Sequence, residues 1–253
     1  MYDEKQFDEL EQEEHALTEE AIIAILVLLA SVRSDLENLI REFYQKYGKD
    51  GVVTYAEARK WVSEKDHRRR LTVLWLAIAA EFATFHTKIN PKFDTFLTQV
   101  IEKELGFFGV DLDIEDILNT PWGVDEAIWA TRLQDDIELW NAYINADLKR
   151  SILKRETVEE VLTAMDKRFT SLEYVIKRLG LTESTAVGSL ARKEIFKELG
   201  INKYQFFARE DERTCDECGA LHGLIFPISA YEVGVTASPI HAHCRCWEVP
   251  IQE

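Results

Sequence analysis

Apolar residues recur at three- and four-residue spacing through most of positions 1–200, and this period restricts the fold more than any other feature of the chain. A period near 3.6 places side chains on one face of an α-helix, whereas a half-buried strand requires strict alternation. Residues 1–200 are therefore predicted to be mostly helix. The clearest stretch is 124–155, where one stripe contains Ile128, Trp129, Leu133, Ile137, Trp140, Ile144 and Leu148.

Glycine and proline residues are predicted to end the helices. Gly48 and Gly51 follow a first helix over residues 8–47, and Pro91 is expected to end a second helix after Asn90, because proline lacks an N–H donor and restricts the residue before it. A shorter helix is predicted over residues 93–109, a single helical turn within 110–123, another helix over 157–169, and one or two helices over 171–200. The last segment is expected to break near Gly180 and to stop at Gly200.

Two stretches have the spacing of a capping box, in which a Thr hydroxyl and a Glu carboxylate bond to each other's backbone N–H groups at a helix start. They are Thr54 with Glu57 and Thr157 with Glu160. Each predicts the first turn of a helix.

The pattern changes after Gly200. Residues 203–209 (KYQFFAR), 224–227 (LIFP) and 246–251 (CWEVPI) are rich in aromatic and β-branched residues, which favour strands. The predicted fold is mainly α, a multi-helix body with a small β-rich, zinc-stapled C-terminal knuckle (α+β). The predicted division is an N-terminal helical domain over 1–120, a helical segment over 121–200 and the knuckle over 201–253.

All four cysteines and three of the six histidines lie in the knuckle. Cys215 and Cys218 have C-x2-C spacing, which lets two thiolates from one turn reach the same ion. A second group, His241, Cys244 and Cys246, has H-x2-C-x-C spacing. Five donors are therefore available for the four positions of a tetrahedral zinc site, and the sequence leaves open which four bind. The predicted metal-ligating residues are Cys215, Cys218, His241, Cys244 and Cys246.

Other interpretations of these residues are kept beside the zinc site. His222 and His243 are expected to be surface or capping residues, and one of Cys244 and Cys246 can pack as a small apolar side chain instead of binding metal. Two structural disulfides are the alternative for the whole cluster. The C-x2-C pair lacks the βαβ context of a thioredoxin-type thiol, and too few residues follow Cys246 for the second helix of a ββα-metal nuclease.

The net charge of −16 argues against a protein whose main work is coating nucleic acid. Residues 149–199 form a local exception, with eleven Lys and Arg against eight Asp and Glu, a net of +3; this stretch is expected to be a solvated helical face, with a transient DNA contact or a partner contact as the alternative. The acidic N-terminus lacks the basic region of a secretory signal, and the apolar run over residues 21–30 is too short to span a bilayer, so a reduced cytosolic setting and no membrane span are expected.

The C-terminal half resembles the phage Mu F-like minor head proteins, also called phage head morphogenesis proteins. The resemblance begins at PWGVDEAIWATRL, continues through a threonine–glutamate helix, and ends on a His-x-x-Cys-Arg-Cys tail. His222 stands where the family more often has an aspartate, and His243 where it often has an asparagine. The matching positions are Thr182, Glu183, Asp211, Arg213, Thr214, Cys215, Cys218, Gly223, Pro227, His241, Cys244, Arg245 and Cys246.

This resemblance implies a structural protein of a tailed phage or prophage and not an enzyme. Members of the family enter the procapsid in few copies in the host bacterial cytoplasm, bind the portal protein and are associated with the DNA-exit region, so the expected location is the cytoplasm during assembly and then the phage head. Portal, with scaffolding or capsid proteins, is therefore the expected partner. Trp129 and Trp140, three helical turns apart on one face, are expected in the core, with a partner contact as the alternative.

A different class of function is an N-terminal effector or toxin-type enzyme joined to a Mu F-like domain. Residues 1–120 would then have to be the effector. They show helical periodicity, without a glycine-rich phosphate loop or a His, Asp or Glu grouping of recognisable catalytic spacing.

Overall fold

A computed structural model describes residues 4–53 and 65–251, with the side chains of 65–73 excluded. The chain forms two compact units, each assembled from separate segments. The knuckle unit comprises Met1–Ile23, Pro91–Arg132 and Lys177–Glu253, and the helical unit comprises Ala24–Asn90 and Leu133–Ile176. The division at residues 120 and 200 along the sequence stays a prediction.

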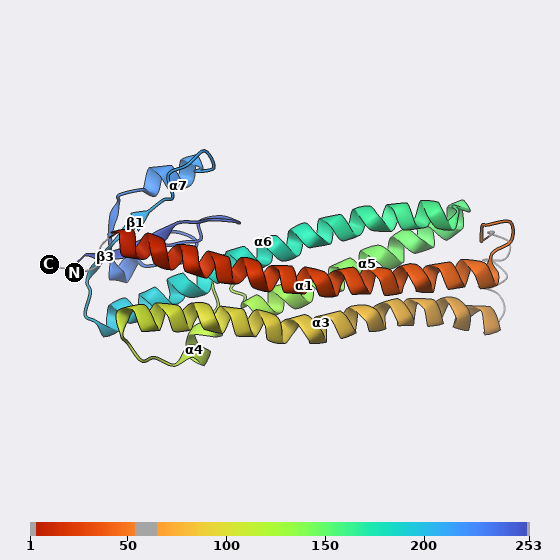
Figure 1. The fold of residues 1–253 in the computed structure, drawn as a ribbon, viewed down its shortest axis with the longest axis horizontal. Coiled ribbons are helices and arrows are strands. Elements are labelled where there is room, and N and C mark those ends of the chain that lie inside the picture. The colour runs from red at the N-terminus through yellow and green to blue at the C-terminus, as the bar shows by residue number, and fades with distance from the viewer. Residues whose placement is uncertain (1–3, 54–64, 252–253) are drawn as a thin grey trace. The chain divides into compact units, whose positions relative to one another are not determined.

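Four long helices account for most of the described residues, which confirms the mainly α class (Figure 1). They are α1 (Glu4–Tyr47), α3 (Lys65–Phe108), α5 (Trp129–Lys154) and α6 (Val158–Glu198). The shorter elements are α4 (Ile114–Leu118), β1 (Lys203–Phe207), α7 (Asp216–Leu221), β2 (Ile225–Pro227), the 3₁₀ turn η1 (Ile228–Ala230) and β3 (Trp247–Ile251). Among the described residues, all named strands lie after Gly200, as predicted.

The helical unit is held together by one apolar stripe from each of its four helix segments. The buried positions repeat at three- and four-residue spacing, as amphipathic helices require. Of the stripe predicted from the sequence, the residues from Trp129 to Leu148 are buried, whereas Ile128 precedes α5 and is half-buried. Trp129, in the knuckle unit, is only 5% exposed, and Trp140, in the helical unit, is 6% exposed. Both tryptophans therefore belong to the core. The buried residues of the helical unit include Ile25, Leu29, Val32, Leu36, Ile40, Leu74, Ile78, Phe82, Phe85, Ile137, Ile144, Met165, Phe169 and Leu172.

The prediction that Pro91 ends a helix is wrong, because α3 continues through it. Pro91 lies on the exposed side of the helix, where water can hydrate the carbonyl that loses its N–H partner. Ile89 and Phe93, on the buried side, are both fully buried. Packing of the residues before and after the proline in sequence therefore keeps the helix continuous. The predicted helix over 93–109 is thus the last part of α3, up to Phe108, and not a separate helix.

The predicted break at Gly180 is also wrong, because α6 is one helix from Val158 to Glu198. A Cβ atom at Gly180 would lie 2.9 Å from two side-chain atoms of Ile22 on α1. The glycine is therefore a site where α1 approaches α6 closely.

Other helix ends agree with the sequence. Gly200 has φ +67°, and the N–H of Ile201 donates to the carbonyl of Phe196, which closes α6. At the start of α6 the capping box is formed: Thr157 N–H donates to Glu160 Oε2 (2.7 Å), and Glu160 N–H donates to Thr157 Oγ1 (3.3 Å). The other predicted capping box, Thr54 with Glu57, lies outside the described residues.

Three short strands form an antiparallel sheet in the order β2–β1–β3. Tyr204 of β1 lies opposite Phe226 of β2 and Pro250 of β3. The inward side chains Tyr204 and Phe206 are fully buried, so the sheet supplies a small core to the knuckle.

One described helix, α1, contains an 18-residue window of mean hydropathy 1.8 and is long and apolar enough to cross a membrane by length and composition alone. Only 28% of that window is buried. Within the apolar run of residues 21–30, Ile22, Ile25 and Leu29 are buried, whereas Ile23 and Val27 are 63% and 66% exposed. The run therefore packs on the core along one side only.

We expect Gly180→Ala to lower the free energy of unfolding by about 1–3 kcal/mol, because the added methyl overpacks the contact with Ile22. Gly106→Ala is the matched control: Gly106 also lies inside a helix, but no atom lies within 4 Å of the place that its new methyl group would occupy. That variant should be stabilised by about 0.4–1 kcal/mol. Thermal unfolding followed by circular dichroism measures both, and equal stabilisation of the two variants would contradict the close packing.

Candidate metal centre

The C-x2-C pair lies at the start of α7. Cys215 is the N-cap residue, and its sulfur accepts a hydrogen bond from the N–H of Cys218 at 3.4 Å. This turn directs both sulfur atoms toward the segment before β3, which carries His241, Cys244 and Cys246. Short local geometry at each end therefore brings together donors that are more than twenty residues apart in the sequence.

The five predicted donors form two overlapping groups. Cys215, Cys218 and His241 make one, and Cys218, Cys244 and Cys246 make the other; within each group the donor atoms lie within 4.8 Å of one another. His241 Nε2 is 3.1 Å from Cys215 Sγ and 3.2 Å from Cys218 Sγ. The cluster can hold a metal ion, and Cys218 is common to both groups.

The sulfur separation fits metal binding better than a disulfide. Cys218 Sγ and Cys244 Sγ are 3.8 Å apart, and all four cysteines are free. A tetrahedral ion with Zn–S bonds of about 2.3 Å holds two sulfur atoms roughly 3.8 Å apart. A disulfide requires about 2.05 Å.

Hydrogen bonds divide the roles of the cysteines next to β3. A hydrogen bond from the Cys246 thiol lowers the pKa of Cys244 to about 6. The same hydrogen bond raises the pKa of Cys246, and burial adds to this effect. Burial raises the pKa of Cys218 to about 12, whereas the backbone N–H of Cys218 lowers the pKa of Cys215. The two sulfurs therefore share one proton, which leaves one thiolate in the Cys244–Cys246 pair.

His241 is oriented for binding through Nε2. Its Nδ1 lies 2.8 Å from the carbonyl oxygen of Ala242, so Nδ1 carries the proton and Nε2 faces the two sulfurs. Burial alone would lower the pKa of His241, but the Ala242 carbonyl and the nearby Cys244 and Cys215 raise it. A carbonyl that fixes the tautomer in this way is a common feature of metal-binding histidines.

His222 and His243 lie outside both donor groups, and each has a local role. His222 is the C-cap residue of α7, and its Nδ1 accepts a hydrogen bond from Ala208 N–H at 3.2 Å. His243 adopts φ +61°, and its N–H donates to Thr182 Oγ1. The left-handed backbone at position 243 explains why asparagine suits it, since Asn tolerates this conformation better than most residues.

An ion pair closes the loop before the C-x2-C turn. Arg245 makes two hydrogen bonds to Asp211, of 2.6 and 2.7 Å, and so its side chain is engaged by a carboxylate. This guanidinium and the N–H of Arg213 hold the pKa of Asp211 well below its usual range. The Thr214 hydroxyl accepts from Asp211 N–H at 2.9 Å. Asp211, Thr214 and Arg245 therefore support the two halves of the donor cluster.

The geometry and the comparisons point the same way. Residues 142–249 match the family described as Phage Mu protein F like protein. The resemblance predicted from the sequence is confirmed, and the match includes all five donor positions. No curated protein and no solved structure matches the chain.

Thr182 and Glu183 of α6 connect the Mu F-like segment, residues 142–249, to other parts of the knuckle unit and to the donor loop. Glu183 is 1% exposed and accepts hydrogen bonds from Trp122 Nε1 (2.9 Å) and Arg132 Nη1 (2.8 Å). Thr182 contacts the loop of His243, and the neighbouring Thr185 donates to the carbonyl oxygen of Cys244 at 3.2 Å. These residues tie the donor loop to α6.

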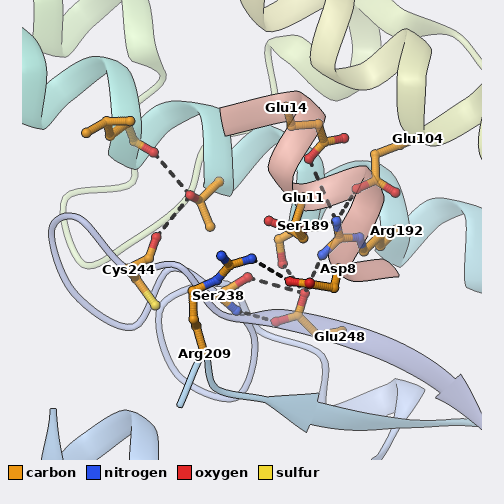
Figure 2. A network of polar contacts seen from close by, with 12 residues as sticks. Asp8, Glu11, Glu14, Glu104, Ser189, Arg192, Arg209, Ser238, Cys244 and Glu248 are labelled. Atoms are coloured by element: carbon orange, nitrogen blue, oxygen red, sulfur yellow. Dashed lines mark hydrogen bonds and ion pairs between the residues drawn. The ribbon is translucent and has the colours of Figure 1, made fainter. Parts of the chain in front are cut away.

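A buried ionic network, which the sequence reasoning missed, joins the Mu F-like segment to α1 and α3 (Figure 2). Arg192 of α6 is 1% exposed and forms ion pairs with Glu11 of α1 and Glu104 of α3. It also lies 3.7 Å from Glu248 of β3. Glu248 in turn accepts hydrogen bonds from Ser238 N–H (2.6 Å) and the Tyr231 hydroxyl (3.0 Å). No local motif marks this network, because its members are distant in sequence.

The network contains more carboxyl groups than cations, and burial raises the pKa of several of them. Burial is the main cause that raises the pKa of Glu104 and that of Glu248 to about 7. Burial and the neighbouring Glu104 raise the pKa of Glu14 well above its usual value. The pKa of Arg192 is raised by the surrounding carboxylates against the opposing effect of burial. The guanidinium therefore stays charged while some carboxyl groups hold protons near neutral pH.

These raised pKa values predict that stability falls as the pH rises. Below the usual Glu pKa of 4.5 the carboxyl of Glu104 is protonated in both the folded and the unfolded state; its contribution to stability is lost as the pH passes its folded value of about 7. The unfolding temperature of the unmodified chain should fall between about pH 6 and 8. In Glu104→Gln we expect this fall to be smaller by about 3 °C or more. Differential scanning calorimetry measures this slope.

The matched control for this prediction is Glu13→Gln. Glu13 is an exposed residue, and a hydrogen bond from Lys103 lowers its pKa. Glu13→Gln should therefore leave the dependence of the unfolding temperature on pH unchanged between about pH 6 and 8. A Glu104→Gln slope equal to that of the unmodified chain would contradict the assignment.

Proposed function

We propose that this protein is a structural minor head protein of a tailed phage or prophage. It enters the procapsid in the host bacterial cytoplasm and then resides in the virion, at the portal and DNA-exit region. The match of residues 142–249 to the Phage Mu protein F like family carries the proposal, and that family indicates phage head morphogenesis.

The role is that of an adaptor and not of an enzyme. The donor cluster has enough side chains to fill a tetrahedral ion with protein ligands, which is the arrangement of structural rather than catalytic zinc. A site closed in this way leaves no position for substrate. The ion would supply folding energy to a knuckle with a small apolar core.

We propose Cys215, Cys218, His241 and Cys244 as the zinc ligands, with Cys246 beside them in the donor cluster. His241 Nε2 lies near both sulfurs of the C-x2-C pair, and Cys244 Sγ lies at the separation of a tetrahedral edge from Cys218 Sγ. Cys246 belongs to the same donor group as Cys244, so the variants below separate the two cysteines. The core cluster around Phe206 and Ala208 packs against these residues. Loss of the ion should therefore also loosen the small sheet.

Purified chain should hold about one zinc ion per molecule, measured by inductively coupled plasma mass spectrometry. Cys215→Ser and Cys244→Ser should lose the ion and destabilise the knuckle by several kcal/mol, whereas Cys246→Ser, a matched change of the same residue type, should retain it. Retention by Cys244→Ser with loss by Cys246→Ser would exchange the roles of these two residues. Metal-free protein with two disulfides would reject the zinc site.

The partner is the portal protein, with scaffolding or capsid proteins as further contacts. Since Trp129 and Trp140 are in the core, the apolar contact has to use other side chains. The best-placed group flanks a cavity of about 310 Å³ lined by Trp122, Val124, Leu190 and Val235. Val124 is fully exposed and Val235 is 55% exposed, so this groove offers apolar surface that a helix of portal could bury.

The basic residues of 149–199 are a weaker candidate for the contact or for a transient DNA contact. Arg150 and Arg168 both pair with Asp147, and Arg192 is buried among carboxylates. Lys197 pairs with Glu194. Ion pairs within the chain reduce the positive charge that this stretch can present to phosphate.

Co-expression of the head proteins tests the partner. We expect the chain to co-purify with portal and the contact to survive 0.5 M salt, because apolar docking is screened little by salt. Val124→Glu should lose the contact, and Lys149→Glu, a control in the basic stretch, should keep it. Phage lacking the protein should form heads of reduced infectivity. Loss of association in high salt, or absence of association at low salt, would contradict the proposal.

A further inference from the structure

Helix α5 carries a second apolar face that is not buried. Its core face contains Leu133, Ile137 and Ile144, all buried. On the other side, Leu139 is 46% exposed, Tyr143 39% and Leu153 48%. Helical spacing of three, four and seven residues places one exposed stripe along the helix, formed by Leu139, Ala142, Tyr143, Ala146 and Leu153, with Arg150 on the same face before Leu153.

The stripe is held in a defined conformation. Trp140 packs edge-on against the ring of Tyr143 at 5.7 Å, and the guanidinium of Arg168 lies 5.1 Å from the centre of the same ring. Arg168 is in turn fixed by its 2.6 Å ion pair with Asp147. Tyr143 is therefore positioned by its own unit and still presents more than a third of its surface.

Charged residues flank the stripe in a fixed order. The end of α5 toward its N-terminus carries Asp135 and Glu138, and the opposite end carries Lys149. Arg150 and Lys154, also at that end, are paired within the chain with Asp147 and Glu156. Glu138 and Lys149 are eleven residues apart, about three turns, so they lie along the same edge of the stripe. This order also suits the helix dipole. The dipole, however, does not account for the exposed apolar residues between the two charged ends.

We propose that this stripe binds the same stripe of a second copy of the chain, with the two α5 helices antiparallel. A two-fold axis perpendicular to two antiparallel helices places each edge of one helix against the same edge of the other. With the axis at the level of Tyr143 and Ile144, Glu138 of each copy faces Lys149 of the other. Opposite charges therefore meet twice, whereas a parallel pair would bring like charges together.

The centre of the stripe is shaped for this contact. Ala142 and Ala146, one turn apart, are exposed and small, so that two helices can approach closely where they cross. Leu139, Tyr143 and Leu153 then cover the contact on both sides. A single helix pair buries less than the roughly 1,600 Å² of a standard stable interface, so the dimer should be weak and form at micromolar concentration. The inference does not depend on the proposed zinc site or on portal binding.

Sedimentation equilibrium of the full chain as purified, over about 1–200 µM, tests the dimer. We expect Leu139→Glu and Ala146→Glu to raise the dissociation constant at least ~tenfold, because each places charge in the apolar contact of both copies. Val124→Glu is the control, since it adds the same charge at an exposed apolar residue outside α5. Circular dichroism confirms that each variant remains helical.

A charge exchange tests the orientation. Glu138→Lys should weaken self-association by bringing it against Lys149 of the second copy, and Lys149→Glu should do the same by facing Glu138. An equimolar mixture of the two variants should recover the affinity of the unmodified chain, because both contacts are again between opposite charges.

Three results would overturn the proposal. The first is a chain that stays monomeric at 200 µM in low salt. The second is a dimer that Leu139→Glu and Ala146→Glu leave unchanged or that Val124→Glu disrupts, which would assign it to another surface. The third is a mixture of the charge variants that associates no better than either variant alone.

Discussion

Arg192 is the residue on which the knuckle unit depends, because one guanidinium joins four elements that are far apart in the chain. It contacts carboxyl groups from α1, α3 and β3 while standing on α6, and it is almost completely buried. A buried charge without partners costs several kcal/mol, so the position of each element is tied to the others. The raised pKa values of Glu104 and Glu248 follow from the same burial. The ionic contacts thereby hold α1, α3, α6 and β3 together within the knuckle unit. A bound metal would in the same way hold the turn before α7 to the loop before β3.

The donor cluster depends on that framework. Its two halves come from the turn before α7 and from the loop before β3, and neither half is fixed by its own sequence alone. Thr185 bonds to the Cys244 carbonyl, and Arg245 is held by Asp211 across the loop. Glu248, two residues after Cys246, is anchored by Arg192. A structural ion at this place would thus couple the small sheet to the long helices.

The two units differ in how they are stabilised. The helical unit relies on regular apolar stripes, and its ion pairs, such as Arg33 with Asp166 and Arg41 with Glu159, are exposed and contribute little. The knuckle unit instead concentrates buried polar groups, including Glu14, Glu104, Arg192 and Glu248. Stability of the helical unit should therefore follow the apolar core, whereas that of the knuckle unit responds to protons and to metal.

The amino-acid sequence by itself determined the secondary structure class, the position of the three strands, the Thr157 capping box, the Gly200 stop and the family resemblance. These are local signals, set by spacing and by residue types a few positions apart. The sequence also identified five candidate metal donors, but their spacing did not show which of them lie close together. Pro91 and Gly180 were misjudged because local propensity was overridden by packing: buried Ile89 and Phe93 carry the helix through the proline, and Ile22 requires the glycine. Only the tertiary structure decided that Arg192 gathers the carboxyl groups and that Cys244 and Cys246 lie close to Cys218. It also decided that His222 and His243 stay outside the donor groups: His222 Nδ1 accepts from Ala208 N–H, and the His243 N–H donates to Thr182. Each of these depends on residues distant in the chain coming within a few ångströms, and no periodicity or motif records that proximity.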